Sequence, residues 1–195
     1  MIKKIALSLL CVGALASTVQ AEEDQTFIGI QLGYQDSGLT LDSAEYGHTD
    51  ITQSTDDNMM TSGIRLGAIN NEYRGMLVVG YDSSYDTDHL EYDNIYGDLV
   101  LDYFILSSSE SMRDSMFRPY IGGFVGYQFT DSDYSLADST KISISDNSVR
   151  YGLEGGLLFE VGDSFNIDLG VKYSANNSDF LENTYGGYIA LDYKF

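Results

Sequence analysis

The chain has 195 residues and a formal net charge of −20, with 30 acidic residues against 10 lysines and arginines. A charge of this sign repels phosphate groups, which argues against nucleic acid as a partner and against basic docking on an anionic membrane surface. The chain carries 16 tyrosines, 9 phenylalanines and 20 glycines but one proline and one cysteine. Because that cysteine is Cys11, the rest of the chain has no thiol for a disulfide or a cysteine-ligated metal.

The first 21 residues have the features of a cleaved secretory signal peptide. Lys3 and Lys4 give a positive start, residues 5–16 are apolar, and Ala21 is the small residue that a signal peptidase needs. The apolar stretch is shorter than the about 20 residues of a membrane-spanning helix. We therefore expect one mature domain over residues 22–195, with a net charge of −22 because the leader holds two lysines and no acid.

Two other interpretations of the leader stay open. The first is an uncleaved anchor. The second is a lipoprotein signal in which Cys11 is the lipidated residue, although Leu10 argues against it because that peptidase requires a small residue before the cysteine.

No segment after the leader is apolar for the 18 or so residues that a helical span needs. The other structure that satisfies every backbone group in lipid is a closed barrel, whose strands alternate apolar positions with small or polar ones. The sequence predicts such strands over 27–35, 60–68, 73–81, 94–105, 119–129, 150–161, 165–174 and 185–195. Eight is an even number, so both ends of the domain are expected on the same side of the membrane.

The apolar positions of these segments are expected to face lipid. In the first half they include Ile28, Ile30, Leu32, Tyr34, Ile64, Leu66, Val79, Tyr81, Leu99, Leu101 and Tyr103. In the second half they include Ile121, Val125, Tyr127, Tyr151, Leu153, Leu157, Ile167, Leu169, Val171, Ile189 and Leu191. The many tyrosines are typical of the aromatic girdles at the two membrane interfaces.

The predicted connections alternate between long and short. Residues 36–59, 82–93, 130–148 and 175–184 are expected to form long polar loops outside the cell. Residues 70–72 and 162–164 are expected to be tight periplasmic turns, and 106–117 a longer periplasmic connection. The fold class is therefore predicted as an all-β, closed, antiparallel up-and-down transmembrane barrel with long acidic extracellular loops.

Two motifs resemble a known family. Residues 118–127 resemble the Arg-Pro-Tyr-x-Gly-x-Gly-x-Gly-Tyr strand of the small outer-membrane β-barrel proteins of the OmpA/OmpX-like and opacity-protein type. The last strand resembles the C-terminal insertion signal of that superfamily, with alternating Ile189, Leu191, Tyr193 and a terminal Phe195. The resemblance implies periplasmic chaperones and the outer-membrane assembly machinery as partners in a Gram-negative bacterium, and it implies no particular reaction.

Charged side chains fall on the predicted inner face. An eight-stranded barrel is only wide enough for side chains to fill its interior, and charges held away from water must be paired. We therefore predict an ion-pair network that closes the lumen, formed by Arg65, Arg74, Asp98, Asp102, Arg150, Glu154, Asp168, Lys172 and Asp192, with Glu160 on the same face. The alternative is a narrow or gated conductance.

Catalytic and metal-binding patterns are weak. The two histidines, His48 and His89, lie in predicted loops, and no His-x-Ser pair resembles the lipid A deacylases. The acidic run from Asp131 lacks the glycine and the closing glutamate of an EF-hand, since Leu136 and Ile142 stand there. The sequence thus predicts neither an enzyme nor a cofactor.

The predicted loops are strongly acidic and face an anionic lipopolysaccharide leaflet. Solvated, mutually repelling loops are expected, and capture of divalent cations such as Ca²⁺ or Mg²⁺ is the alternative. The carboxylates are Asp36, Asp42, Glu45, Asp50, Asp56, Asp57, Asp82, Asp86, Asp88, Asp131, Asp133, Asp138, Asp179 and Glu182. The function expected from the sequence is a structural or surface-interaction barrel. A small channel for ions or hydrophobic solutes is the alternative, and a lipid-modifying enzyme is a weaker third.

Overall fold

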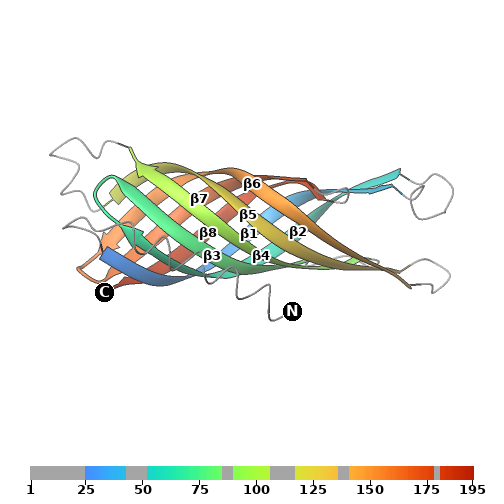
Figure 1. The fold of residues 1–195 in the computed structure, drawn as a ribbon, viewed down its shortest axis with the longest axis horizontal. Helices are drawn as coiled ribbons and strands as arrows, with labels where there is room; N and C mark the ends of the chain where they lie inside the picture. Colours follow the sequence, from blue (N-terminus) through green and yellow to red (C-terminus); the bar gives the residue numbers. More distant parts are fainter. Residues whose placement is uncertain (1–24, 43–51, 85–89, 106–116, 136–140, 178–180) are drawn as a thin grey trace.

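The computed structural model describes residues 25–42, 52–84, 90–105, 117–135, 141–177 and 181–195. It has eight strands in chain order (Figure 1), which are β1 (Gln25–Asp42), β2 (Thr52–Ile69), β3 (Tyr73–Ser84), β4 (Leu90–Phe104), β5 (Phe117–Ser135), β6 (Lys141–Val161), β7 (Phe165–Asn176) and β8 (Leu181–Lys194). In the described part of the chain, no helix is long and apolar enough to cross a membrane. The leader, His48 and His89 lie outside the described residues.

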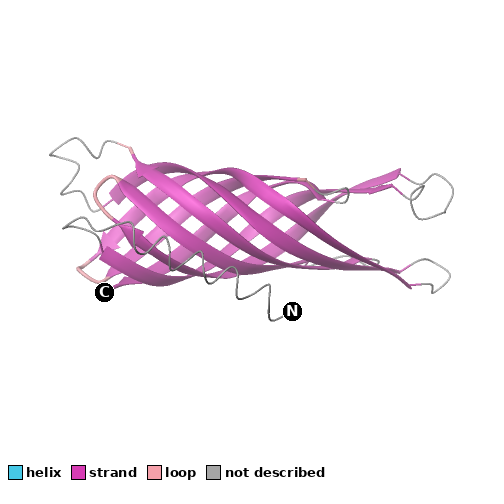
Figure 2. Cartoon of the chain, viewed as in Figure 1, coloured by secondary structure: helices cyan, strands magenta, loops and turns pink. Residues whose placement is uncertain are grey.

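The strands form one closed antiparallel barrel. Each strand pairs with the next in the chain, and β1 pairs with β8 to complete the ring (Figure 2). At the seam the Phe195 N–H donates to the Thr26 carbonyl oxygen at 3.0 Å, and the Thr26 hydroxyl donates to the Phe195 carbonyl oxygen at 2.9 Å. The predicted fold class is therefore confirmed.

The two faces of every strand differ as the alternation predicts. On β1, for example, Phe27 is fully buried inside the barrel while Ile28 and Ile30 are about half exposed outside. Each of the eight strands presents large apolar side chains outward, among them Ile28, Ile64, Val79, Leu101, Ile121, Leu153, Val171 and Ile189. An apolar belt that runs around the whole barrel is the surface of a transmembrane strand domain.

Aromatic residues mark the two ends of this belt. Near the tight turns, at the end of the barrel that the sequence predicts to be periplasmic, Tyr73 lies against Tyr103 with ring centroids 5.4 Å apart, and Phe165 lies against Tyr193 at 5.3 Å. Towards the opposite end, Tyr127 and Phe129 lie 5.1 Å apart on the outer face of β5. These positions are those of interfacial girdles.

Both predicted tight turns are confirmed. Between β2 and β3, the Asn70 carboxamide oxygen accepts the backbone N–H groups of Glu72 and Tyr73, each at 2.8 Å. Between β6 and β7, Gly162 has a φ of +66°, a conformation that side chains other than glycine rarely adopt. The predicted connection 106–117 lies between β4, which ends at Phe104, and β5, which begins one residue earlier than predicted, at Phe117. Residues 106–116 lie outside the described residues.

The predicted extracellular loops are wrong in extent, because the strands continue well into them. β1 and β2 reach Asp42 and Thr52, where the prediction had a loop over 36–59. β5 and β6 likewise take up most of the predicted loop 130–148, and more than half of 82–93 and of 175–184 also belongs to strands. Beyond the membrane these strands need no continuous apolar face, so only short alternations, such as Leu39 with Leu41, remain among their polar residues.

Inner glycines lie opposite large inner side chains on the neighbouring strand. Gly122 pairs with Asp102 and Gly80 pairs with Tyr96, and in each case the large side chain leans over the glycine. The same arrangement holds for Gly29 with Asp192, Gly126 with Asp98, Gly156 with Tyr120 and Gly170 with Tyr188. The glycines therefore supply the space that lets the lumen hold its large polar side chains.

This arrangement predicts that Gly122→Ala destabilises the barrel while Gly97→Ala does not. A methyl group at Gly122 would overlap the Asp102 carboxylate and lie 2.8 Å from the Leu101 carbonyl oxygen, whereas the space beside the outward-facing Gly97 is open. We expect Gly122→Ala to cost roughly 1–3 kcal/mol, as overpacking does. The measurement is urea unfolding in micelles followed by far-ultraviolet circular dichroism, since the chain has no tryptophan. Equal midpoints for the two variants would contradict the packing argument.

Candidate functional site

The lumen is the candidate site, and its first ion-pair cluster lies towards the periplasmic end. Arg74 from β3 donates from Nε to Asp102 at 2.7 Å and from Nη1 to Asp168 at 2.8 Å. Arg65 from β2 lies 2.9 Å from Asp168 and 3.4 Å from Asp192. All five side chains are at most 1% exposed. Two arginines thus hold three carboxylates from three different strands across the barrel.

A second cluster lies nearer the extracellular end. Arg150 from β6 approaches Asp98 at 3.3 Å and Asp82 at 3.7 Å, and the Lys172 amino group donates to Asp98 at 2.7 Å. Aromatic rings cover both cations. The Arg150 guanidinium carbon lies 4.2 Å from the centroid of the Tyr96 ring, and Lys172 Nζ lies 3.8 Å from the centroid of the Phe124 ring. Charge pairing and cation–π contact therefore both hold these two side chains in place.

A tyrosine relay begins at the first cluster and reaches Glu154. The Tyr120 hydroxyl donates to Asp168 at 2.8 Å and lies 2.7 Å from the Tyr188 hydroxyl, which in turn donates to Glu154 at 3.1 Å. Glu154 is buried but has no cation within ion-pair distance in the described part of the chain. The clusters and this relay together hold six carboxylates against four cations, and Glu154 is the carboxylate without an ionic partner.

Apolar side chains close the periplasmic end of the lumen. Five inward-facing residues near the ends of their strands are at most 4% exposed and pack in one cluster, namely Phe27, Ile69, Met76, Phe104 and Leu158. Below them Arg118 lies over the Phe104 ring at 3.7 Å and donates to the carbonyl oxygens of Asn70 and Asn71, and to Glu160 at 3.1 Å. This end is therefore both dry and tied to the β2–β3 turn.

Hydrogen-bonded polar side chains around Asp82 fill the lumen at the extracellular end. Asp82 accepts from Gln35 at 3.2 Å and from Asn94 at 2.9 Å, and Asn94 accepts from Thr130 at 3.3 Å. Gln128 donates to the Ser148 hydroxyl on the next strand at 2.9 Å. All of these residues are buried. The hydrogen bonds run across β1, β3, β4, β5 and β6, so the strands are tied together at this level too.

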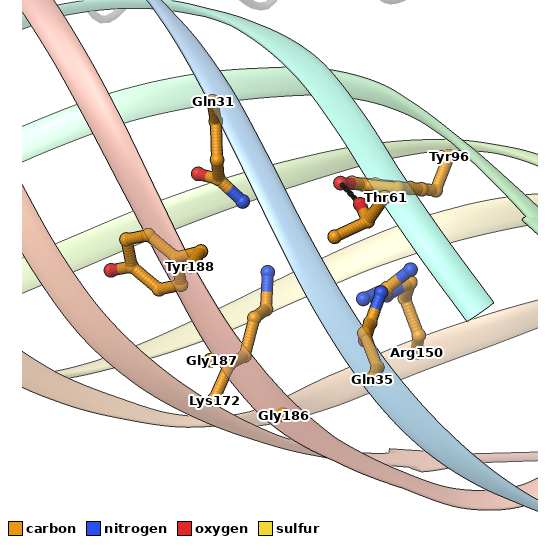
Figure 3. Close-up of a pocket in the computed structure, with 9 residues that line it drawn as sticks. All are labelled: Gln31, Gln35, Thr61, Tyr96, Arg150, Lys172, Gly186, Gly187 and Tyr188. Carbon is orange, nitrogen blue, oxygen red and sulfur yellow. Dashed lines mark hydrogen bonds between the residues drawn. The ribbon is translucent and has the colours of Figure 1, made fainter. Parts of the chain in front are cut away.

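A small cavity lined by described residues lies between these layers. Its volume is about 10 Å³, and it is lined by Gln31, Gln35, Thr61, Tyr96, Arg150, Lys172, Gly186, Gly187 and Tyr188 (Figure 3). Figure 3 shows the Gln31 amide and the Lys172 amino group pointing into the same space. A cavity of this size has room for about one water molecule. It is too small for an organic ligand.

The structure places all nine residues of the predicted network on the inner face. Eight of them make ion pairs, and Glu154 makes a hydrogen bond instead. Glu160 lies at the rim with Arg118 and not in the clusters. Sequence reasoning missed Asp82, because it fell in a predicted loop, and it missed the apolar closure. The sequence did carry a signal for the closure, because near these strand ends the inward-facing and the outward-facing positions are both apolar, as in residues 76–79 and 157–159.

The residues of the predicted insertion signal lie on the outer face of β8 and, for Phe195, directly after its end. Ile189, Leu191, Tyr193 and Phe195 are about half exposed or more. Phe165 and Phe195 flank the Tyr193 ring at 5.3 and 6.4 Å. Within the described ranges no group of three His, Cys, Asp or Glu side chains is arranged to hold a metal ion.

The geometry now permits comparison with known proteins. The chain is similar to the crystal structure of Neisserial surface protein A, with a TM-score of 0.60 and 14% identity over 89% of this chain and 100% of that one. It is also similar to the outer membrane protein OprG of Pseudomonas aeruginosa, with a TM-score of 0.50 and 16% identity over 91% of this chain and 99% of that one. The chain has the fold of the small outer-membrane β-barrels.

The family resemblance is thereby confirmed at the level of the fold. No family model matches the sequence, and no curated protein is similar to it in sequence. At identities this low the match shows the fold alone, so the function has to be argued from the residues of this chain.

The clusters predict losses of stability of very different size for two charge-removing substitutions. Asp168→Asn deprives both Arg65 and Arg74 of a partner in a dry lumen, so we expect a loss of roughly 3–5 kcal/mol in unfolding free energy. Glu154→Gln removes a carboxylate that has no ionic partner and keeps an acceptor for Tyr188, so we expect less than about 1 kcal/mol. Urea unfolding of both variants in micelles measures this difference. A loss for Glu154→Gln as large as that for Asp168→Asn would disprove this assignment of the network.

Proposed function

We propose that the protein is a non-conducting barrel of the Gram-negative outer membrane, which holds β-hairpins at the cell surface for interaction with other molecules. The observation that carries this proposal is the filled lumen. An apolar layer, two ion-pair clusters and a hydrogen-bonded polar layer follow one another from the periplasmic to the extracellular end. Ions crossing such a lumen would have to displace buried, paired charges.

The membrane location is supported by the outer face. Its apolar belt and aromatic ends fit a lipid bilayer, and the fold is that of small outer-membrane barrels. We propose that periplasmic chaperones and the outer-membrane assembly machinery deliver the chain after Sec-type export, with the last strand as the insertion signal. Lipid and lipopolysaccharide are then its immediate surroundings.

The surface role is supported by the two tallest hairpins. β1 with β2, and β5 with β6, run well past the rest of the barrel at one end (Figure 1). That end is opposite the short turns at residues 70–72 and 162–164, so it faces the outside of the cell if the barrel has the usual orientation. Acidic residues of this region, such as Asp36 and Asp131, are candidates for screening by divalent cations.

The two alternatives receive less support. A narrow channel would require a path past Phe27, Phe104 and Leu158, which are at most 1% exposed. A lipid-modifying enzyme would require a nucleophile with a base at one rim, and both histidines lie outside the described residues. We therefore retain the channel as the second candidate and the enzyme as the third.

Conductance is the direct test of the proposal. The mature protein, reconstituted in planar bilayers, is expected to give no discrete current steps at either polarity, because the lumen is filled along its length. Insertion is verified on the same preparation by the mobility of the unboiled protein on a denaturing gel, which differs from that of the boiled chain when the barrel is intact. Reproducible steps from inserted, folded protein would overturn the non-conducting assignment in favour of the channel.

The terminal strand gives a separate prediction. Phe195→Ser removes an outward aromatic side chain that stacks on Tyr193 but leaves the backbone bonds to Thr26 in place. We expect less protein in the outer membrane, with unchanged unfolding of the fraction that has folded. Thr26→Val is the matched control, because it removes one hydrogen bond at the seam and leaves the terminal aromatic residue. Unchanged membrane levels for Phe195→Ser would contradict a role in insertion.

A further inference from the structure

Each tall hairpin has one edge that no described strand covers. β2 pairs with β1 from Thr52 onward, but its ladder with β3 begins only at Met59. β6 pairs with β5 from Lys141 onward, but its ladder with β7 begins only at Arg150. The last hydrogen bond on that side of β6 is donated by the Asn177 N–H to the Val149 carbonyl oxygen at 3.0 Å.

The other edge of each tall hairpin is covered. β8 accompanies β1 as far as the pair of Leu39 with Leu181, and β4 accompanies β5 as far as the pair of Leu90 with Tyr134. Each hairpin is therefore supported along its first strand and open along its second. An open strand edge presents backbone donors and acceptors in the spacing that an added strand requires.

The direction of the backbone groups on β6 follows from its bonds. Backbone groups of alternate residues point to the same side of a strand, and the Val149 carbonyl points towards β7. The N–H of Asn147, on that same side, is taken by the neighbouring Asp146 carboxylate at 2.7 Å. The register with β5 continues without a shift to Lys141, so the backbone groups of Ser145, Ser143 and Lys141 also point towards the open side.

The open edge of β6 is better suited to pairing than that of β2. The β2 edge contains Asp56, Asp57 and Asn58, and aspartate and asparagine are depleted in strands. Residues 141–145 of β6 read Lys-Ile-Ser-Ile-Ser, with two β-branched residues of high strand propensity and one charge. The β6 edge from Lys141 to Ser145 thus has the higher strand propensity of the two.

A second copy of the chain in the same membrane does not fit this edge. Two barrels side by side are related by an axis along the membrane normal, so strands tilted by about 35–45° would cross at roughly 70–90° and form no ladder. The net charge of −20 on each copy also opposes their approach. The occupant must therefore come from outside the membrane plane.

Charge indicates what kind of segment this is. From residue 130 to 148 the hairpin carries Asp131, Asp133, Asp138 and Asp146 against Lys141 alone. We propose that the open edge of β6 from Lys141 to Ser145 binds an extended, positively charged segment of a partner protein, which adds to the hairpin as a further strand. This inference rests on the surface role proposed above and names the binding element and its partner class.

The test uses the folded protein in zwitterionic detergent micelles and a labelled synthetic peptide of about ten residues that alternates lysine and valine. Binding is followed by fluorescence anisotropy. The peptide control has the same sequence and charge but carries N-methyl groups on alternate residues, which removes the donors of one edge. The protein variants are Ser143→Pro, which removes one N–H on the open side, and Ser143→Ala, which keeps it. Proline is tolerated at such an edge position, and unboiled gel mobility verifies folding.

We expect the unmodified peptide to bind the wild-type protein and Ser143→Ala equally. Ser143→Pro and the N-methylated peptide should each weaken binding by about tenfold or more, since a backbone hydrogen bond is lost. Equal binding of both peptides would show that charge attraction alone accounts for the binding, and it would overturn the proposal. Unchanged binding by Ser143→Pro would show that the peptide binds elsewhere than on β6. A change of oligomeric state in that variant would show that the edge contacts a second copy of the chain. Either result also overturns the proposal. None of these outcomes depends on conductance, which tests the filled lumen separately.

Discussion

The seam between β1 and β8 is the constraint on which the rest of the structure depends. A strand that crosses lipid has no water to satisfy its backbone groups, so the sheet must close on itself. Here the ladder between β1 and β8 runs from the pair of Phe27 with Lys194 to that of Leu39 with Leu181, and Phe195 extends it to Thr26. Closure with eight strands then fixes a narrow interior.

The narrow interior explains the composition of the inner face. Arginines, tyrosines and carboxylates are too large to fill every inner position, so glycines stand opposite them, as Gly126 does for Asp98. Once dry, each charge requires a partner, and Arg65 and Arg74 share Asp168 for this reason. The few cationic side chains of the protein are concentrated in the lumen. All six lysines and arginines whose side chains the structure describes face inward, namely Arg65, Arg74, Arg118, Arg150, Lys172 and Lys194.

The part of this architecture that is visible in the sequence is the part that lipid dictates. Ile28 and Val171 could be placed outside, and Arg65 and Asp168 inside, because the apolar belt imposes a period of two. Beyond the membrane that requirement ends, so residues 38–42 and 141–145 keep only two alternating apolar residues each, which was too short a pattern to mark them as strand, and Asp82 was assigned to a loop. Nor does alternation tell which acid pairs with which base. Glu154 and Asp102 look alike in sequence, and only the leaning of Asp102 over Gly122 towards Arg74 separates them.

The same constraint accounts for where an open edge is tolerated. Within lipid an unpaired edge would leave backbone groups without partners, and there every strand of the barrel is paired on both sides. Above the membrane water satisfies those groups, so adjacent hairpins are free to differ in height. β6 extends past the last residue of β7 that pairs with it, Asn176, and this difference in height alone creates the edge. A barrel with a filled lumen thus gains a surface for recognition from its backbone, without any change to the strands that cross the membrane.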